Sequence, residues 1–269
     1  MSTLSALRSQ PAEEKAIGIV GGVGPAAGTH FQSLINRAVP QVSRDQDNPT
    51  IFHISAPAGI ADRTRFLKGE IQENPAQGAL EVIEMLELLS REKIKRTIVA
   101  GVPCNTFHAP PIFGELQRLM QEAGIENVQV LHMIDEVVSS IAREYPTLKK
   151  IGLLSTTGTR QQRIYHDRLE TAGLSVIEVA EPVQDDLHET IYHPEWGIKA
   201  VSNPVSETAL RRFESYADHL IEQGAEAIIL GCTEIPLALS GTHYKDTPLI
   251  DPMEALAQAL VRHALPSRF

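Results

Sequence analysis

The sequence comprises 269 residues, of which 42% are hydrophobic and 22% charged, and its formal net charge is -10 at pH 7. This composition is typical of a globular chain that folds as one large or two modest domains. The negative charge argues against sequence-independent nucleic-acid binding, and no apolar run approaches the roughly 18 residues of a membrane-spanning helix. We therefore expect no nucleic-acid or membrane partner. Because no signal-peptide pattern precedes the fold, we expect residues 1–14 to be a flexible extension of a cytoplasmic protein.

Short aliphatic segments recur along the chain and predict strands. Their hydrophobicity is continuous rather than alternating, which is typical of strands that are covered on both faces. Periodic segments such as 78–93 and 207–224 predict helices between the strands, and a last helix over 252–265 is expected to pack back on the first half. Alternating strands and helices indicate a parallel, doubly wound α/β fold. In chain order, the expected strands are 16–20, 50–55, 96–102, 128–133, 150–155, 174–179, 225–231 and 247–251.

The two halves of the chain resemble each other. KAIGIVGGVGPAAG from Lys15 aligns with KKIGLLSTTGTRQQ from Lys149, and the segments around Cys104 and Cys232 align at a similar offset. A chance match of short aliphatic strands is the alternative to a duplication. A duplicated unit predicts two pseudo-symmetric doubly wound domains with mainly parallel sheets and an active site in the cleft between them, beyond the carboxyl ends of the strands. We expect one domain to comprise residues 15–123 plus 249–269 and the other residues 124–248.

A glycine-rich turn follows the first predicted strand. GVGPAA from Gly22 fits the loose pattern G-x-G-x-x-A, and Asp45 and Asp47 follow at about the distance of a dinucleotide fingerprint. Both aspartates lie in a polar turn, however, rather than at the end of the second strand, where the ribose partner belongs. Pro25 suits the first turn of a helix, whose N–H groups can bind an anion. A small carboxylate at Gly24 and Pro25 is therefore favoured over a dinucleotide, and a purely structural turn is the third possibility.

The only two cysteines occupy similar local contexts. Cys104 lies in PCNTFH and Cys232 in GCTEIPL, each behind an aliphatic run and before polar residues. They are expected to be free thiols, because cytosolic disulfides are rare. No C-x2-C or H-x3-H pair supports zinc, and the spacing of Cys104 and His108 is a weak signal, so we expect no metal site.

Two opposed thiols suit the racemisation of a small molecule. One thiolate can remove a Cα proton from one face while the other thiol delivers a proton to the opposite face. Helix starts after both cysteines predict a lowered pKa for each thiol. Asn105, Thr106 and Thr233 are suited to holding an α-carboxylate, which stabilises the charge that develops on deprotonation. No lysine lies in a recognisable pyridoxal-phosphate context, so the expected chemistry needs no cofactor.

These motifs together resemble the aspartate/glutamate racemase family. The resemblance runs in the family's order over residues 15–255 and implies two pseudo-symmetric α/β domains, an acidic amino-acid substrate and a homodimer. Cys104 paired with Cys232 is its most specific part. The matching segments are GIVGGVGPAAGT (18–29), DRT (62–64), PCNTFH (103–108), TTGT (156–159), GIKA (197–200) and GCTEIPL (231–237).

The resemblance also implies roles for individual residues. Cys104 and Cys232 match the two catalytic thiols, and Glu234 resembles an auxiliary acid beside the second thiol. The alternative for Glu234 is a helix N-terminal acid favoured by the helix dipole. Arg63 and Lys199 match positions that anchor the side-chain carboxylate of the substrate. The α-carboxylate cradle consists of Gly24, Pro25, Asn105, Thr106 and Thr233.

Three residues depart from the family pattern. Gly28 stands where the family usually has Thr, with Thr29 as a possible substitute, and Ala61 stands where Pro is common. Phe107 replaces a small residue, and its ring could change the size of the pocket. These departures leave the substrate open between aspartate, placed first, and glutamate. A maleate isomerase or an enzyme similar to hydantoin racemase is an alternative within the same superfamily, and a non-catalytic dicarboxylate-binding protein is an alternative outside it.

Overall fold

A computed structural model describes residues 14–269, which divide into two compact units. The first unit comprises the chain up to Met133 together with Leu256–Phe269, and the second comprises Ile134–Ala255. Both boundaries fall later than the predicted ones, because residues 128–130 pair within the first sheet and residues 247–250 within the second. The predicted N-terminal extension lies outside the described residues except for Glu14, which is buried and pairs with Arg268 at 3.2 Å.

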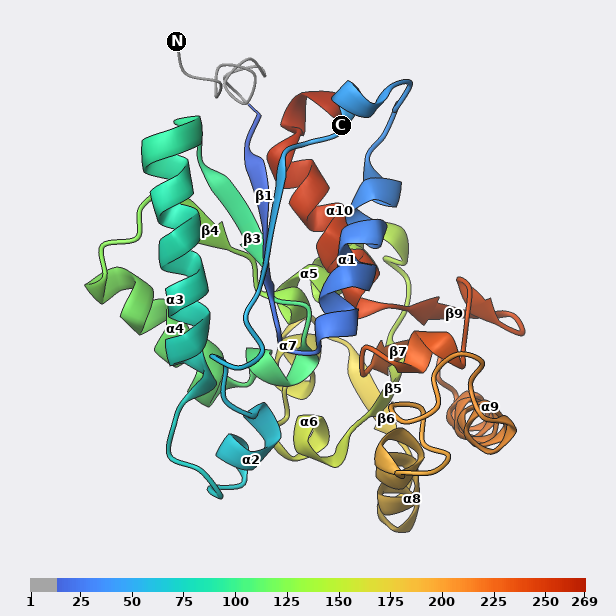
Figure 1. Ribbon diagram of the computed structural model, residues 1–269. Coiled ribbons are helices and arrows are strands. Elements are labelled where there is room, and N and C mark those ends of the chain that lie inside the picture. Colours follow the sequence, from blue (N-terminus) through green and yellow to red (C-terminus); the bar gives the residue numbers. More distant parts are fainter. Residues whose placement is uncertain (1–13) are drawn as a thin grey trace. The chain divides into compact units, whose positions relative to one another are not determined.

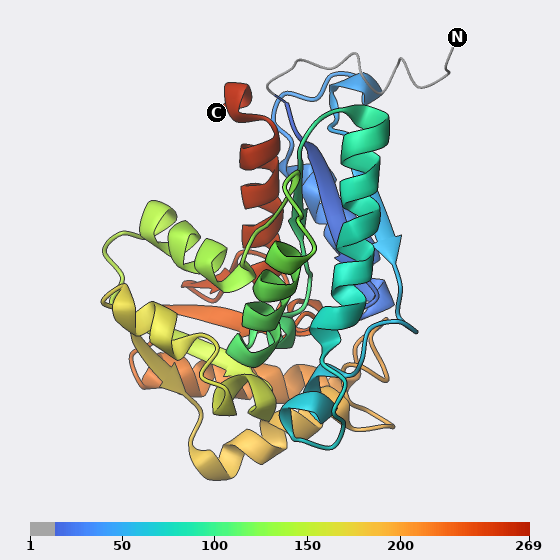
Figure 2. The same ribbon diagram turned by 90° about the vertical axis from the view of Figure 1, so that its left-hand side faces the viewer.

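The first unit is built on a parallel sheet of strand order β2-β1-β3-β4 (Figure 1). Helices α3 and α4 pack side by side (Figure 2), and their buried side chains form one core with those of the sheet. Helix α10 packs back on β3 as predicted, since Leu256 and Leu260 fill the space beside Gly101. The elements are β1 (Ala16–Gly21), α1 (Pro25–Ala38), η2 (Asp45–Asp47), β2 (Ile51–Ser55), α2 (Arg63–Leu67), α3 (Pro75–Leu88), the π-helix η3 (Leu89–Ile94), β3 (Ile98–Gly101), η4 (Asn105–His108), α4 (Pro110–Glu122), β4 (Val128–Val130), α10 (Pro252–Ala264) and η6 (Pro266–Arg268).

The second unit carries a sheet of order β6-β5-β7-β9-β8, in which only the short β8 is antiparallel. Helices α8 and α9 pack on it through a core that includes Leu187, Phe213 and Leu220. Its elements are α5 (Met133–Glu144), β5 (Lys150–Ser155), α6 (Thr157–Gln161), α7 (His166–Thr171), β6 (Ser175–Glu178), α8 (Glu181–Tyr192), α9 (Glu207–Glu222), β7 (Ala227–Gly231), η5 (Ile235–Leu237), β8 (His243–Tyr244) and β9 (Thr247–Ile250).

The predicted α/β fold with mainly parallel sheets is confirmed. Each predicted strand is present, and both sheets place their first strand between the second and the third. The strands that precede the two cysteines, β3 and β7, are therefore topologically equivalent, as the internal alignment predicts. The sequence reading missed β8 and the π-helical end of the helix predicted over 78–93. Within residues 14–269, no helix combines the length and the apolar character that crossing a membrane requires.

Candidate active site

The glycine-rich turn joins β1 to α1 in the first unit. Gly22 and Gly24 have φ values of 99° and 109°, a region that favours glycine. Gly24 is the N-cap of α1 and Pro25 opens the helix, as predicted. Asp47 accepts hydrogen bonds from the N–H groups of Ser43 and Arg44 in the exposed turn before β2. That carboxylate is thus used within its own turn, which removes support for a dinucleotide site.

Gly28 and His53 explain one departure from the family pattern. A Cβ at Gly28 would lie 2.7 Å from Nε2 of His53, and a Cβ at Gly21 would lie 2.6 Å from the same atom. The imidazole therefore fills the space that a threonine at position 28 would need. Thr29 does not substitute, because it is exposed and donates to the Pro25 carbonyl. Burial lowers the pKa of His53, so its ring is neutral at pH 7.

Cys104 follows β3 and precedes the short helix η4. The residue is buried and extended, and its N–H donates to the Val102 carbonyl at 2.8 Å. Its carbonyl accepts from the Phe107 N–H at 3.2 Å and from Nδ1 of His108 at 2.9 Å. The segment is therefore fixed through its backbone.

The neighbours of Cys104 differ in how far they are buried. Asn105 is buried and Thr106 is half-buried, beside the thiol in sequence. Phe107 is fully buried in the core of the first unit. Its ring therefore contributes to the core against which the Cys104 segment packs.

Arg63 opens α2, which contacts η4. Its Nη1 donates a long hydrogen bond to the Ala61 carbonyl, at 3.5 Å. Within residues 14–269 its buried Nε–H has no hydrogen-bond partner. Buried donors are normally satisfied, so this guanidinium retains capacity for an anion.

Cys232 follows β7 in the second unit and belongs to a charged cluster. Its thiol donates to Oε2 of Glu234 at 3.1 Å, and the Thr233 hydroxyl donates to the same oxygen at 2.8 Å. Oε1 of Glu234 pairs with Nζ of Lys199 at 2.6 Å. Glu234, Cys232, Thr233 and Lys199, predicted as site residues from separate motifs, therefore meet around one carboxylate.

The cluster sets the protonation of its members. Burial, followed by the Glu234 charge, raises the pKa of Cys232 well above its usual range, and Lys199 offsets only part of this. This reverses the predicted lowering for this thiol, because burial and the neighbouring carboxylate act against its ionisation. Burial by itself would raise the pKa of Glu234, but Lys199 and the bonds from Cys232 and Thr233 lower it. Burial opposes the charge of Lys199, yet its neighbours Cys232 and Glu234 raise its pKa.

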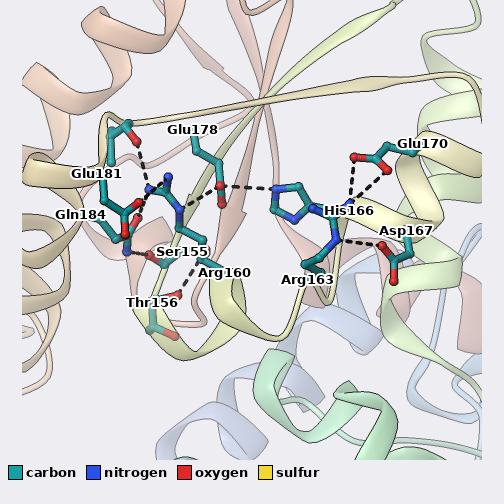
Figure 3. A network of polar contacts seen from close by, with 11 residues as sticks. Ser155, Thr156, Arg160, Arg163, His166, Asp167, Glu170, Glu178, Glu181 and Gln184 are labelled. Carbon is teal, nitrogen blue, oxygen red and sulfur yellow. Dashed lines mark hydrogen bonds and ion pairs between the residues drawn. The ribbon is translucent and has the colours of Figure 1, made fainter.

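A second charged network orders the TTGT segment after β5 (Figure 3). Arg160 pairs with Glu178 and Glu181, each at 3.0 Å, and donates to the Val179 carbonyl and to Oε1 of Gln184. His166 reaches the same carboxylate, Glu178, at 3.3 Å. Nε2 of Gln184 donates to the Ser155 carbonyl at 3.0 Å, and Ser155 is the register partner of Gly231, so this network supports the strand end beside Cys232.

The sequence reading missed His53, Arg160 and Tyr165. Tyr165 is fully buried, and burial followed by the charges of Asp251 and Cys232 raises the pKa of its phenol. Gly28 was the one available signal for His53, because a glycine in place of a larger residue indicates that a neighbouring side chain fills the space. Among residues 14–269, no group of three His, Cys, Asp or Glu side chains is arranged to hold a metal ion.

Comparison with known proteins identifies the family. The sequence profile of the Asp/Glu/hydantoin racemase family matches residues 20–260, which is most of the chain. The chain belongs to the Asp/Glu/hydantoin racemase family. It is therefore an isomerase, and the resemblance found in its motifs is confirmed.

Solved structures and curated relatives agree with this assignment. The aspartate racemase of Picrophilus torridus superposes with a TM-score of 0.73 at 27% identity, over 93% of this chain and 94% of that one. An aspartate racemase homologue from Pyrococcus horikoshii shares the fold, with a TM-score of 0.65 at 24% identity over 93% and 99% of the two chains. A glutamate racemase of Koribacter versatilis is 27% identical to this chain. The aligned segment covers 51% of this chain and only 45% of that enzyme.

Proposed function

We propose that this family member racemises an acidic amino acid without a cofactor. The first proposed substrate is aspartate, converted from the L to the D form, and the second is glutamate. The observation that carries the proposal is the presence of one cysteine just beyond the equivalent strand of each unit, Cys104 three residues after β3 and Cys232 directly after β7. Both thiols are proposed to act on one Cα, from opposite faces.

The proposed reaction exchanges one proton for another. A thiolate takes the Cα proton and becomes a thiol, leaving a carbanion delocalised into the α-carboxylate. The second thiol then gives its proton to the opposite face and becomes a thiolate. Charge and protons balance, and the enzyme ends ready for the reverse direction.

The protonation of Cys232 assigns the first roles. Because burial and Glu234 raise the pKa of Cys232, this thiol holds its proton at neutral pH and starts as the donor. Cys104 is then the proposed base. In the reverse direction Cys232 must lose its proton, and Glu234, which already accepts its hydrogen bond, is the proposed auxiliary catalytic residue.

Arg63 is the better-supported anchor for the side-chain carboxylate. Its buried Nε–H lacks a partner within residues 14–269, whereas Lys199 is paired with Glu234. A substrate carboxylate at Lys199 would therefore compete with Glu234 for one ammonium group. The proposed α-carboxylate cradle consists of Gly24, Pro25, Asn105, Thr106 and Thr233.

The test is incubation of L- and D-aspartate and L- and D-glutamate in heavy water without added cofactor. We expect deuterium at Cα and loss of optical rotation, and Cys104→Ser and Cys232→Ser should each abolish racemisation. Full racemisation by either variant would remove the two-thiol mechanism. A covalent adduct with maleate would favour a maleate isomerase, turnover of hydantoins would favour that branch of the family, and dicarboxylate binding without any turnover would favour a binding protein.

We further propose that the enzyme works as a homodimer and without metal or pyridoxal phosphate. Light scattering at the assay concentration measures the oligomeric state, and we expect the mass of a dimer. Dialysis against a chelator and treatment with hydroxylamine, which removes pyridoxal phosphate, should leave the racemisation rate unchanged.

A further inference from the structure

His108 makes a side-chain contact with the backbone of Cys104. Its Nδ1 lies 2.9 Å from the Cys104 carbonyl oxygen. A carbonyl oxygen only accepts hydrogen bonds, so Nδ1 carries the hydrogen in this contact. The same oxygen accepts from the Phe107 N–H at 3.2 Å, and the Cys104 N–H donates to Val102. Both peptide groups of Cys104 are thus bound, one of them by an imidazole.

The imidazole itself is held on several sides. His108 is fully buried and stacks on Phe113, with ring centres 5.2 Å apart and planes at 24°. The ring of His132 meets it edge-on at 4.8 Å and meets Phe113 at 4.5 Å. A ring packed in this way has little rotational freedom, so the position of its Nδ1–H is fixed by the core.

We propose that His108 is a positioning residue for Cys104, and that its Nδ1–H fixes the peptide between Cys104 and Asn105 and thereby the direction of the thiol. The proposal rests on the proposed racemisation for its kinetic readout. It adds a role for a residue that acts through the backbone of Cys104. Burying a polar ring costs stability unless it is hydrogen-bonded, and here the bond goes to the residue whose geometry matters most.

The kinetic test compares two substitutions of similar size. In His108→Asn the side-chain amide can donate near the place of Nδ1, whereas His108→Leu has no donor. A misplaced reacting group costs on the order of 100-fold in rate, so we expect kcat to fall by about that factor in His108→Leu, with KM within about threefold, and to be largely restored in His108→Asn. Equal loss of kcat in two folded variants would overturn the proposal, because ring volume would then be what matters.

Phe113→Leu is the matched control. It removes the stacked ring and keeps the hydrogen bond, so its kcat should lie much closer to wild type than that of His108→Leu. A loss as large as that of His108→Leu would assign the effect to core packing and would also count against the proposal.

Two further measurements do not depend on racemisation. Nitrogen-15 NMR of the histidine rings should show the hydrogen of His108 on Nδ1, and a ring with hydrogen on Nε2 alone would overturn the proposal even if the leucine variant failed to fold. In a Cys232→Ser background Cys104 is the sole cysteine. Its alkylation by iodoacetamide should be about tenfold faster with His108→Leu, because the buried segment opens more readily, and near the parent rate with His108→Asn. Equal rates in both would contradict the proposal. If no acidic amino acid is racemised while these two results hold, the proposed function fails and the positioning role stands.

Discussion

Cys104 and Cys232 follow equivalent strands, yet the groups that fix them differ in charge. Around Cys104 the contacts are backbone hydrogen bonds and a ring packed among aromatic side chains. Around Cys232 they are a carboxylate and an ammonium group, Glu234 and Lys199, bound to each other. Two units of similar topology can thus position a cysteine by packing and backbone hydrogen bonds in one unit and by charged side chains in the other. Substitutions that alter charge should act on Cys232, and those that alter packing should act on the first unit.

The largest expected effect tests the charged side of this comparison. Glu234→Gln removes the negative charge that helps to raise the pKa of Cys232, so that pKa should fall, whereas Lys199→Met should raise it further. Alkylation of Cys232 in a Cys104→Ser background at pH 8 should accordingly become faster by about tenfold with Glu234→Gln and slower with Lys199→Met. Racemisation, measured with both thiols present, should fall by about 100-fold in each.

The same two substitutions should leave Cys104 unaffected. In a Cys232→Ser background, the alkylation rate of Cys104 is the control. A change in the same direction for both variants at Cys232 would show that charge does not set the state of this thiol.

The next effect tests packing in the first unit. Gly28→Thr places a side chain where His53 lies and should destabilise the protein by about 2 kcal/mol, measured by urea denaturation. Adding His53→Ala should recover most of that loss. Gly114→Ala is the control, since nothing lies within 4 Å of a Cβ there, and it should stabilise helix α4 by about 0.5 kcal/mol. No recovery in the double variant would mean that the clash is not with His53.

Arg160 allows a comparison of ion pairs within the second unit. Arg160→Met leaves Glu178, whose side chain is only 12% exposed, without its main counter-charge and should cost about 1–2 kcal/mol. Arg211→Met breaks an exposed pair with Glu207 and should cost less than about 0.5 kcal/mol. Equal losses of unfolding free energy would contradict the assignment of Arg160 as the centre of its network.

The smallest effect concerns pH. Burial lowers the pKa of His53 from 6.5, so below pH 6.5 the unfolded chain binds this proton more readily than the folded chain. Stability should therefore be lost as pH falls from 7.5 to 5.5, and His53→Gln should reduce that loss slightly, because solvent screens this half-buried ring. His243→Gln, at an exposed position, is the control. An unchanged pH dependence in His53→Gln would show that the ring is protonated equally in both states.

Much of the architecture could be predicted because buried parallel strands have continuous aliphatic segments. The strands before Cys104 and Cys232 were found in this way, and β3 and β7 proved equivalent. The short β8 could not be found, because two residues carry no periodicity. The domain boundaries were displaced because strand pairing at 128–130 and 247–250 depends on partners distant in sequence.

The candidate site was predictable as a set of residues and less so in its contacts. Motifs predict Lys199 and Glu234 as site residues, but that they bind each other follows only from the fold. The predicted direction of the Cys232 pKa shift was wrong, because a helix-start pattern in the sequence does not reveal burial or a neighbouring carboxylate. The spacing of His108 from Cys104 is a weak metal signal in the sequence, whereas in the structure its Nδ1 contacts the carbonyl of Cys104.

The path of the chain has a consequence for synthesis on the ribosome. Helix α10 completes the first unit: Leu256 and Leu260 pack beside Gly101, and the Ala264 carbonyl accepts from the Lys15 N–H. The second unit, Ile134–Ala255, is contiguous and is synthesised before residues 256–264, which form most of that helix. Residues 15–133 are therefore synthesised before the helix that covers the α10 side of β3, and the first unit is completed only after the second has been synthesised.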